Sequence, residues 1–450
     1  MERKETREIH DKKWVLEQIK KYKIKFIYLW FTDILGFLKS LTITAKEIEG
    51  ALERGIGFDG SSIEGFARIE ESDMIAMPDP STFCFLPQDH GEPGIMARVF
   101  CDILEPDGSF YKSDPRYVLK KNLKRASNLG YTFYVGPELE YFYFQSPEIP
   151  PKGLDKGGYF DLIPRDMASD LRKKTAFVLE RMGIEVECSH HEAAPSQHEI
   201  DLRYADALTM ADNTMTYRLI VKEIALKHSV YATFMPKPVY GENGSGMHTH
   251  QSLFKGGRNA FFVSEDKHHL SEVAKRYIAG LLRHVPEFTL IANQWVNSYK
   301  RLVPGYEAPV YISWALRNRS DLVRVPLYQS GKEKATRVEL RSPDPACNPY
   351  LTFAVMLSAG LEGIEKKYDF VEPVKENVYK MSEEERRKEG IGQLPGNLWE
   401  AIKLAEKSDW LRKTLGDPLF SKFIENKKIE WQNYRSKVTS YELEKYLPIL

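Results

Sequence analysis

Residues 131–144 read YTFYVGPELEYFYF, and this stretch decides the fold. It is rich in aromatic residues, which predicts a β-strand. Successive side chains of a strand point to opposite faces, so Glu138 and Glu140 would share one face with Phe142 and Phe144. Two carboxylates side by side among aromatic rings are costly to bury unless a cation neutralises them. The pattern therefore favours metal ligation over the alternative, an edge strand whose two acids face water.

A second acidic segment, residues 187–201, reads ECSHHEAAPSQHEID. Pro195 in its middle predicts two strands that meet at a turn. Glu192 and Glu199 would then converge across the hairpin, with three histidines nearby. Taken alone, a histidine-rich strand pair is as often structural as functional.

A glycine-rich segment, residues 243–252, reads NGSGMHTHQS and precedes the next expected strand. Glycines let the backbone approach a ligand closely, and His248 and His250 would share one face of that strand. An ordinary turn is the alternative, because a single glycine-rich loop is a weak signal.

A fourth element, RVELR at residues 337–341, places Glu339 between two arginines on its own face. More arginines precede it, namely Arg301, Arg317, Arg319 and Arg324. Guanidinium groups suit phosphate and carboxylate ligands. An ordinary salt-bridged strand or a solvated basic face explains any one of them equally well.

The rest of the chain predicts an α+β protein, because the expected strands are grouped instead of alternating strictly with helices. A helix over 8–22 opens a small β-rich unit that ends at a turn cluster, residues 105–109. The strands of that unit are expected at 25–31, 39–44, 82–87 and 95–104. Beyond a helix starting at Asp114-Pro115, strands are expected at 131–144, 184–203 and 247–254, and helices at 165–182, 206–227, 270–284, 350–366 and from about 397 onward.

Composition narrows the class of protein. The chain has 450 residues, enough for two or three domains, with 64 basic and 64 acidic residues. This balance argues against a nucleic-acid partner or a polybasic membrane protein. The four cysteines show no zinc or disulfide spacing, the charged N-terminus lacks a signal sequence, and the longest apolar stretch, 350–361, is too short to span a bilayer. We therefore expect a cytoplasmic protein with no membrane partner.

Together the elements supply five carboxylates and one imidazole, at Glu138, Glu140, Glu192, Glu199, Glu339 and His248. Such an oxygen-rich set suits Mg²⁺ or Mn²⁺ better than zinc, and its size suggests two or more ions. The nearby arginines and glycine loop suggest a phosphorylated cosubstrate. Chemistry alone thus predicts a metal-dependent phosphoryl-transfer enzyme and leaves a two-metal phosphohydrolase open.

The sequence resembles glutamine synthetases of type I, alpha subtype, in motifs spread over nearly the whole chain. The matching segments are FDGSSIEGF at 58–66, GPELEYF at 136–142, SHHEAAPSQHEID at 189–201, NGSGMHTHQS at 243–252, KRLVPGYEAP at 300–309, NRS at 318–320 and RVELRSPDPACNPYL at 337–351. The presence of all these motifs in this order is highly specific for that family.

The resemblance implies a β-grasp-like N-terminal domain, residues 1–107, and a catalytic domain, residues 108–450, with an antiparallel sheet and surrounding helices. The implied activity is nitrogen assimilation, in which ATP drives ligation of ammonia to L-glutamate through γ-glutamyl phosphate. The implied assembly is a dodecamer of two hexameric rings, with active sites between subunits. The implied partners are glutamate, ammonium, ATP and two or more Mg²⁺ or Mn²⁺ ions.

Residue roles follow from the same resemblance. One metal would bind Glu140, Glu192 and Glu199, and a second would bind Glu138, His248 and Glu339. ATP would contact Glu187, His250, Gln251, Ser252, Arg319 and Arg324. Glutamate would contact Asn243, Gly244, Arg301, Glu307, Arg319 and Arg341. The catalytic residues would be Asp59, Glu307 and Arg324, where Asp59 of a neighbouring subunit accepts a proton from ammonium and Glu307 lies on a flap.

The resemblance also bears on regulation. Adenylylated relatives carry a tyrosine in a short N-L-Y-D-L-P segment, but Gly392 stands at the comparable place, so a non-adenylylated enzyme is expected. Arg68 matches the arginine that mediates glutamine feedback in the alpha subtype. A nitrogen-signalling regulatory protein is a further partner known for such enzymes. Competing hypotheses are a ligase for a polyamine or another bulky amine, and a non-catalytic relative, which would have lost metal ligands that this sequence retains.

Overall fold

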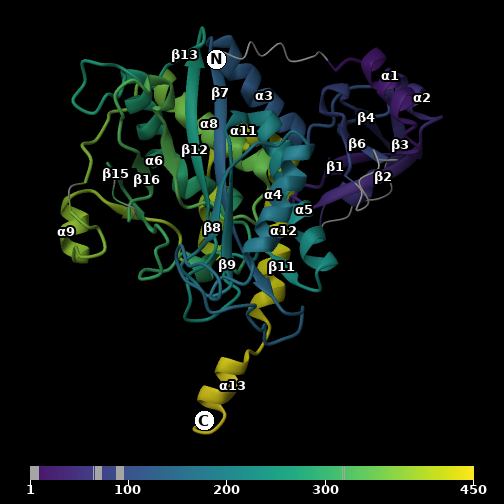
Figure 1. The fold of residues 1–450 in the computed structure, drawn as a ribbon. Helices are drawn as coiled ribbons and strands as arrows, with labels where there is room; N and C mark the ends of the chain where they lie inside the picture. Colours follow the sequence, from purple (N-terminus) through teal and green to yellow (C-terminus); the bar gives the residue numbers. More distant parts are fainter. Residues whose placement is uncertain are drawn as a thin grey trace.

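The structure is a computed structural model that describes residues 10–63, 65, 73–87, 96–316, 318, 320–374 and 376–450. Figure 1 shows a small N-terminal unit beside a larger region built around two long neighbouring strands, β7 and β12. Strands are grouped and helices surround them, so the predicted α+β class is confirmed. Arg68, Arg317 and Arg319 lie outside the described residues.

The N-terminal unit is one six-stranded sheet covered by helices. Its central strands β1 and β6 run parallel, and the other pairings are antiparallel. Val15 and Ile19 are buried on one side of the first helix and join Ile27 and Val99 in a core of the unit's own. The elements are α1 (Lys12–Tyr22), β1 (Phe26–Thr32), β2 (Leu38–Thr44), α2 (Ile48–Arg54), β3 (Ile56–Asp59), η1 (Gly60–Ile63), β4 (Asp73–Pro78), η2 (Pro80–Thr82), β5 (Cys84–Phe85) and β6 (Met96–Leu104).

The larger region contains a ten-stranded sheet with a principal order of β15-β16-β17-β12-β7-β9-β8. All pairings are antiparallel except that of β15 with β16. The strands are β7 (Thr132–Phe144), β8 (Val186–His191), β9 (Gln197–Leu202), β10 (Ala205–Asp206), β11 (Tyr231–Thr233), β12 (Met247–Lys255), β13 (Arg258–Asn259), β15 (Trp314–Leu316), β16 (Val323–Val325) and β17 (Val338–Leu340). A separate pair joins β14 (Tyr311–Ile312) to β18 (Gly392–Gln393).

Helices bury the large core together with this sheet. They are α3 (Pro115–Asn128), α4 (Ser169–Arg181), α5 (Ala207–Lys227), α6 (Glu272–Ala292), α7 (Ser298–Arg301), α8 (Pro349–Lys366), α9 (Glu383–Lys388), α10 (Leu398–Glu406), α11 (Asp409–Leu415), α12 (Asp417–Arg435) and α13 (Ser440–Tyr446), with η3 at Glu333–Ala335. Asp114 caps α3 as expected, and its side chain accepts hydrogen bonds from Arg116 N and Tyr117 N. No helix among the described residues is long and apolar enough to cross a lipid bilayer.

One helix is longer than its sequence predicted. The expected helix over 270–284 continues as α6 to Ala292, with Pro286 inside it. Proline normally ends or bends a helix because it lacks a backbone N–H. Here both halves of α6 are buried, including Tyr277 and Phe288, and packing against the core outweighs the local preference.

The two units are joined by a tight turn that carries Gly36. Asn348, the N-cap of α8, donates through Nδ2 to the carbonyls of Asp33 and Ile34, both at 3.2 Å. Gly36 has φ = +87°, and a Cβ there would lie 2.9 Å from Asn348 Cα. A residue with a side chain would clash at this joint, so glycine fixes the close approach of the units.

Candidate active site

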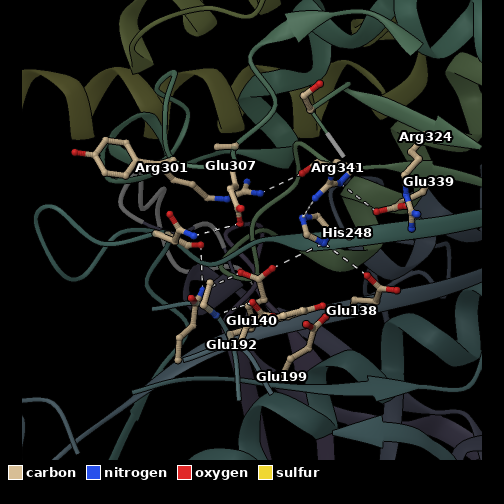
Figure 2. Close-up of a pocket in the computed structure, with 18 of the residues that line it drawn as sticks. Glu138, Glu140, Glu192, Glu199, His248, Arg301, Glu307, Arg324, Glu339 and Arg341 are labelled. Atoms are coloured by element: carbon tan, nitrogen blue, oxygen red, sulfur yellow. Dashed lines mark hydrogen bonds and ion pairs between the residues drawn. The ribbon is translucent and has the colours of Figure 1, made fainter. Parts of the chain in front are cut away.

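One cavity of about 960 Å³ collects most of the predicted site residues. Figure 2 shows four acidic side chains, Glu138, Glu140, Glu192 and Glu199, on one side of the cavity and the arginines on the other, where Glu307 lies beside Arg301 and Glu339 beside Arg324. The predicted residues that line it are Glu138, Glu140, Glu192, Glu199, Asn243, Gly244, His248, Arg301, Glu307, Arg324, Glu339 and Arg341. The structure therefore brings these residues together in one cavity, while their roles in a site stay predictions.

The strand register explains how distant residues meet. Glu140 on β7 is paired with Glu199 on β9, and Glu138 is paired with His248 on β12. On the far side of β12, His250 is paired with Glu339 on β17. Directly opposite residues have neighbouring side chains on the same face of a sheet. Four adjacent strands thus form one continuous acidic surface across the sheet.

The acids around Glu140 carry more negative charge than their surroundings neutralise. Burial, followed by the charge of Glu192, raises the pKa of Glu140 to about 8. Burial, followed by the charges of Asp201 and Glu140, also raises the pKa of Glu199 well above its usual range. Since clustered carboxylates ionise readily only beside a cation, this oxygen-rich donor set fits a divalent metal ion.

The neighbouring group is compensated by histidines. Burial alone would raise the pKa of Glu138, but His250 and His248 outweigh it and hold this pKa well below its usual range. His250 Nε2 lies 2.7 Å from Glu138 Oε1, whereas His248 Nδ1 lies 3.6 Å from Glu138 Oε2. The atoms of Glu138, His250 and Glu339 come close enough to share an ion, as do those of His190, Glu192 and Glu199. His250, predicted to contact ATP, thus lies beside the expected second metal site.

Arginines also line the cavity, and Glu339 contacts two of them. Glu339 Oε1 lies 3.2 Å from Arg341 Nε, and its Oε2 accepts a hydrogen bond from Arg324. Arg301 is buried, and its guanidinium donates to the carbonyls of Ser342 at 2.6 Å and Arg341 at 3.1 Å. Arg301 therefore anchors the backbone that presents Arg341, in addition to lining the cavity.

The glycine loop, residues 241–246, lies directly on Arg301. A Cβ at Gly244 would come within 2.4 Å of the Pro236 carbonyl oxygen and 2.9 Å of Arg301 Cγ. The backbone N–H of Gly246 donates to Glu140 Oε2 at 2.9 Å. Only glycine permits this approach at residue 244, so the loop is a part of the site and not an ordinary turn.

Several predicted residues do not line the cavity, although one of them, His250, contacts Glu138. Asp59, Glu187, His250, Gln251 and Ser252 are not among the residues that line the cavity. The side chain of Gln251 is buried on the other face of β12 and accepts a hydrogen bond from the Tyr277 hydroxyl at 2.7 Å. The Asp59 carboxylate accepts hydrogen bonds from Ser61 N and Oγ, both at 2.9 Å. Arg319 lies outside the described residues, so its predicted role is unaffected.

Two supporting residues were not recognised in the sequence. Gln197 donates through Nε2 to Glu140 Oε2 at 2.9 Å and to the Gly244 carbonyl at 3.1 Å, so it joins the acidic surface to the glycine loop. Asp155 accepts a hydrogen bond from Ser196 N at 2.9 Å and lies 3.0 Å from His191 Nε2. The position of Gln197 beside Pro195-Ser196 was a usable signal, but nothing near Asp155 in the sequence indicated its distant partner.

A small sheet unit joined to an α+β region with an acidic, arginine-rimmed cavity is typical of metal-dependent enzymes that act on anionic substrates. Comparison with known families identifies the particular one. The glutamine synthetase β-grasp domain family matches residues 23–106, and the glutamine synthetase catalytic domain family matches residues 112–446. The chain therefore belongs to the glutamine synthetase family. It is a ligase of the glutamate–ammonia class.

Similar proteins are found in several organisms. The chain is 53% identical to a glutamine synthetase of Mycolicibacterium smegmatis over 97% of this chain and 99% of that protein. It is 51% identical to one of Methanosarcina mazei, over 97% of each chain. Among solved structures, a GmaS/ADP complex superposes with a TM-score of 0.88 at 30% identity, covering 98% of this chain and all of that one. Plasmodium falciparum glutamine synthetase superposes with a TM-score of 0.86 at 27% identity, covering 97% of this chain and 98% of that one.

Proposed function

We propose that this protein joins ammonia to L-glutamate through γ-glutamyl phosphate, and that it is a type I enzyme of the alpha subtype. The observation that carries the proposal is the single cavity in which an acidic surface faces Arg324 and Arg341. Divalent cations fit the acidic side, and guanidinium groups suit phosphate and carboxylate. One cavity thus offers sites for the metals, the phosphoryl group and the amino acid.

Two metal sites are proposed. Glu140, Glu192 and Glu199 would hold one ion, and Glu138, Glu339 and His248 would hold the other, with His250 close to the second. When bound, Mg²⁺ or Mn²⁺ would neutralise charge on the ATP phosphates. The raised pKa of Glu140 supports the first site, because a cation is needed before this buried carboxylate ionises readily at neutral pH.

Activation of glutamate is the first chemical requirement, because a free carboxylate is a poor acceptor for an amine. Transfer of the γ-phosphoryl group of ATP to the side-chain carboxylate of glutamate would create a good leaving group. Arg324 would stabilise negative charge on the transferred phosphoryl group, and the resemblance implies the same role for Arg319. Asn243, Gly244, Arg301 and Arg341 would hold glutamate, which is consistent with their position around the cavity.

Ammonium must then lose a proton before its nitrogen can attack. Glu307 lines the cavity and is exposed on the flap, residues 303–307, where a carboxylate would attract the cation. Asp59 would accept the proton. Asp59 lies in the N-terminal unit and is absent from the cavity lining of its own chain, which supports delivery from a neighbouring subunit in a dodecamer of two hexameric rings.

Intersubunit delivery can be tested by complementation. Asp59→Asn and Glu339→Ala subunits, each inactive alone, would be dissociated, mixed and reassembled. Shared sites would regain activity, because some interfaces combine an intact Asp59 with an intact Glu339. Mixtures that assemble but stay inactive would contradict the shared site, and light scattering of the parent would test the dodecamer.

The central experiment supplies ATP and glutamate with ammonium, methylamine or putrescine in separate reactions. We expect glutamine and phosphate to form in equal amounts with ammonium, because acidic side chains suit a small cation. A clear preference for putrescine would favour the competing hypothesis, a ligase for bulky amines. Phosphate release from phosphate esters without ATP or glutamate would instead favour the phosphohydrolase.

Regulation is part of the proposal. Arg68 would mediate inhibition by glutamine, so Arg68→Ala is expected to shift the inhibition curve to higher glutamine concentration. Identical curves for variant and parent would reject that role. The expected absence of adenylylation rests on Gly392, which has no hydroxyl to modify.

Free thiols at Cys101 and Cys347 suit a reducing compartment, so we place the reaction, and any nitrogen-signalling protein partner, in the cytoplasm.

A further inference from the structure

Lys237 contacts two segments that border the cavity, the glycine loop and the flap. Its ammonium group donates a hydrogen bond to the carbonyl oxygen of Glu242 in the glycine loop. The same Nζ atom lies 3.7 Å from the centroid of the Tyr306 ring in the flap. A cation over the face of an aromatic ring is attracted to it electrostatically. One side chain thus joins two segments that are distant in sequence.

The backbone of Lys237 is itself held in place. Its N–H donates to Asn297 Oδ1 at 2.7 Å, and its carbonyl accepts from Asn297 Nδ2 at 3.0 Å. Asn297 directly precedes α7, which ends with Arg301. The backbone of Lys237 is therefore held beside α7, the helix that contains Arg301. This restrains the position of the ammonium group that contacts the flap.

The flap has few other attachments. Among the residues that the structure describes, the backbone of residues 304–307 makes no backbone-to-backbone hydrogen bond with another segment. Asn243 Nδ2 donates to Glu307 Oε2 at 3.3 Å, which is a long hydrogen bond at an exposed position. The half-buried ring of Tyr306 offers a larger and better shielded contact than this one.

We propose that Lys237 is a positioning residue that holds the flap closed through the face of Tyr306, and so keeps water out while the activated glutamate awaits ammonia. This inference rests on the proposed function, because it concerns the lifetime of γ-glutamyl phosphate. If water attacks the γ-carbonyl carbon, the bond to the phosphate oxygen breaks and glutamate and phosphate are released. The net result is ATP hydrolysis without glutamine.

The first test measures flap opening by hydrogen–deuterium exchange in the full-length protein without substrates. It follows the amides of Leu302 and Val303 at the base of the flap, which donate to the carbonyls of Ser298 and Arg301. Lys237→Met removes the cation, and Tyr306→Leu removes only the ring. Loss of a cation–π contact shifts an opening equilibrium by roughly two- to thirtyfold, so exchange should rise by that factor in both variants. Lys237→Arg and Tyr306→Phe keep a cation and a ring face, and both should stay close to the parent.

Lys255→Met is the matched control. Lys255 Nζ lies 5.5 Å from the Tyr131 ring centroid, away from the cavity, so the same substitution there should leave exchange of the flap unchanged. If Lys237→Met raises exchange but Tyr306→Leu does not, the lysine acts only through Glu242 and the proposal is overturned. If Lys237→Met fails to fold, the proposal is still tested by Tyr306→Leu, which should raise exchange, and by Lys237→Arg, which should not.

The second test measures the ratio of phosphate released to glutamine formed at limiting ammonium. The parent should give a ratio near one, Lys237→Met and Tyr306→Leu should exceed it, and the double variant should resemble the single ones. A merely structural defect would lower both products together and leave the ratio at one, which would overturn the proposal. A parent that forms no glutamine would refute the proposed function, while flap exchange would still report on Lys237.

Discussion

His250 Nε2 lies 2.7 Å from Glu138 Oε1, although His248 and not His250 is the residue paired with Glu138 in the sheet. His250 is paired with Glu339 on the other neighbouring strand, so its ring lies between two carboxylates. Both histidines lower the pKa of Glu138 against the effect of burial. Imidazole groups thus lie between carboxylates over three adjacent strands, and they keep Glu138 ionised. Glu140 lacks this compensation, and its pKa is raised.

Removal of Glu339 should abolish phosphoryl transfer while leaving the fold intact. Glu339→Ala removes a proposed metal ligand and leaves Arg324 and Arg341 without their shared partner. Losses of preorganised electrostatic groups lower turnover by about 10²- to 10³-fold. The measurement is isotope scrambling between the bridge and nonbridge oxygens of labelled ATP with glutamate present. Glu333→Ala, at an exposed carboxylate, is the control, and unchanged scrambling in Glu339→Ala would contradict the metal assignment.

The stability of the metal-free protein should depend on pH through Glu140. Its pKa is about 8 in the folded protein against an ordinary value of 4.5, so the folded state binds this proton more tightly than the unfolded chain. The stabilisation is therefore complete below pH about 4.5 and is lost as the pH rises toward about 8.

We expect the melting temperature of the parent to fall between about pH 6 and about pH 8, and to fall less in Glu140→Gln, which cannot ionise. Calorimetry with a chelator present measures this difference, and the other ionisable groups are common to both proteins. Mn²⁺ should raise the melting temperature of the parent more at the higher pH. Equal falls in parent and variant would show that Glu140 is not the titrating group.

Asp155 should support the hairpin that carries Glu192 and Glu199. Asp155→Asn weakens the acceptor for Ser196 N and the contact with His191, at a cost of about 1–3 kcal/mol for a buried polar group. Urea unfolding measures the stability, and Mn²⁺ titration measures the metal site. Asp161→Asn, on the same loop but partly exposed, should change neither quantity. A variant as stable as the parent would mean that the hairpin is held by other contacts.

Gly244→Ala should impair glutamate binding more than stability. The added Cβ would lie 2.4 Å from the Pro236 carbonyl oxygen, so the glycine loop must shift. Strain of about 1–3 kcal/mol corresponds to a rise of roughly 5- to 150-fold in the KM for glutamate. Gly396→Ala is the matched control, because its nearest atom would be a flexible carboxylate oxygen of Glu400 at 3.5 Å. An unchanged KM in Gly244→Ala would show that the loop adapts without affecting the substrate.

Much of the fold could be predicted because it follows local patterns. Aromatic and β-branched runs predicted β1 and β7, and Asp114-Pro115 predicted the start of α3. The end of α6 could not be predicted in the same way, because the apolar environment of the helix, and not its local sequence, carries it past Pro286. The resemblance to a known family supplied the likeness of the N-terminal unit to a β-grasp domain, which the family comparison then confirmed.

In the candidate site, too, some features follow from local sequence and others only from tertiary packing. Alternation along a strand is a local property, so the primary structure already placed Glu138 and Glu140 on one face, and the residue types already pointed to hard metal ions. Strand order and register depend on packing between segments far apart in the chain, and these brought Glu199 opposite Glu140 and Glu339 opposite His250. Contacts such as Lys237 with Tyr306 leave no local trace in the sequence, because they arise only after the core has set the distance between two loops.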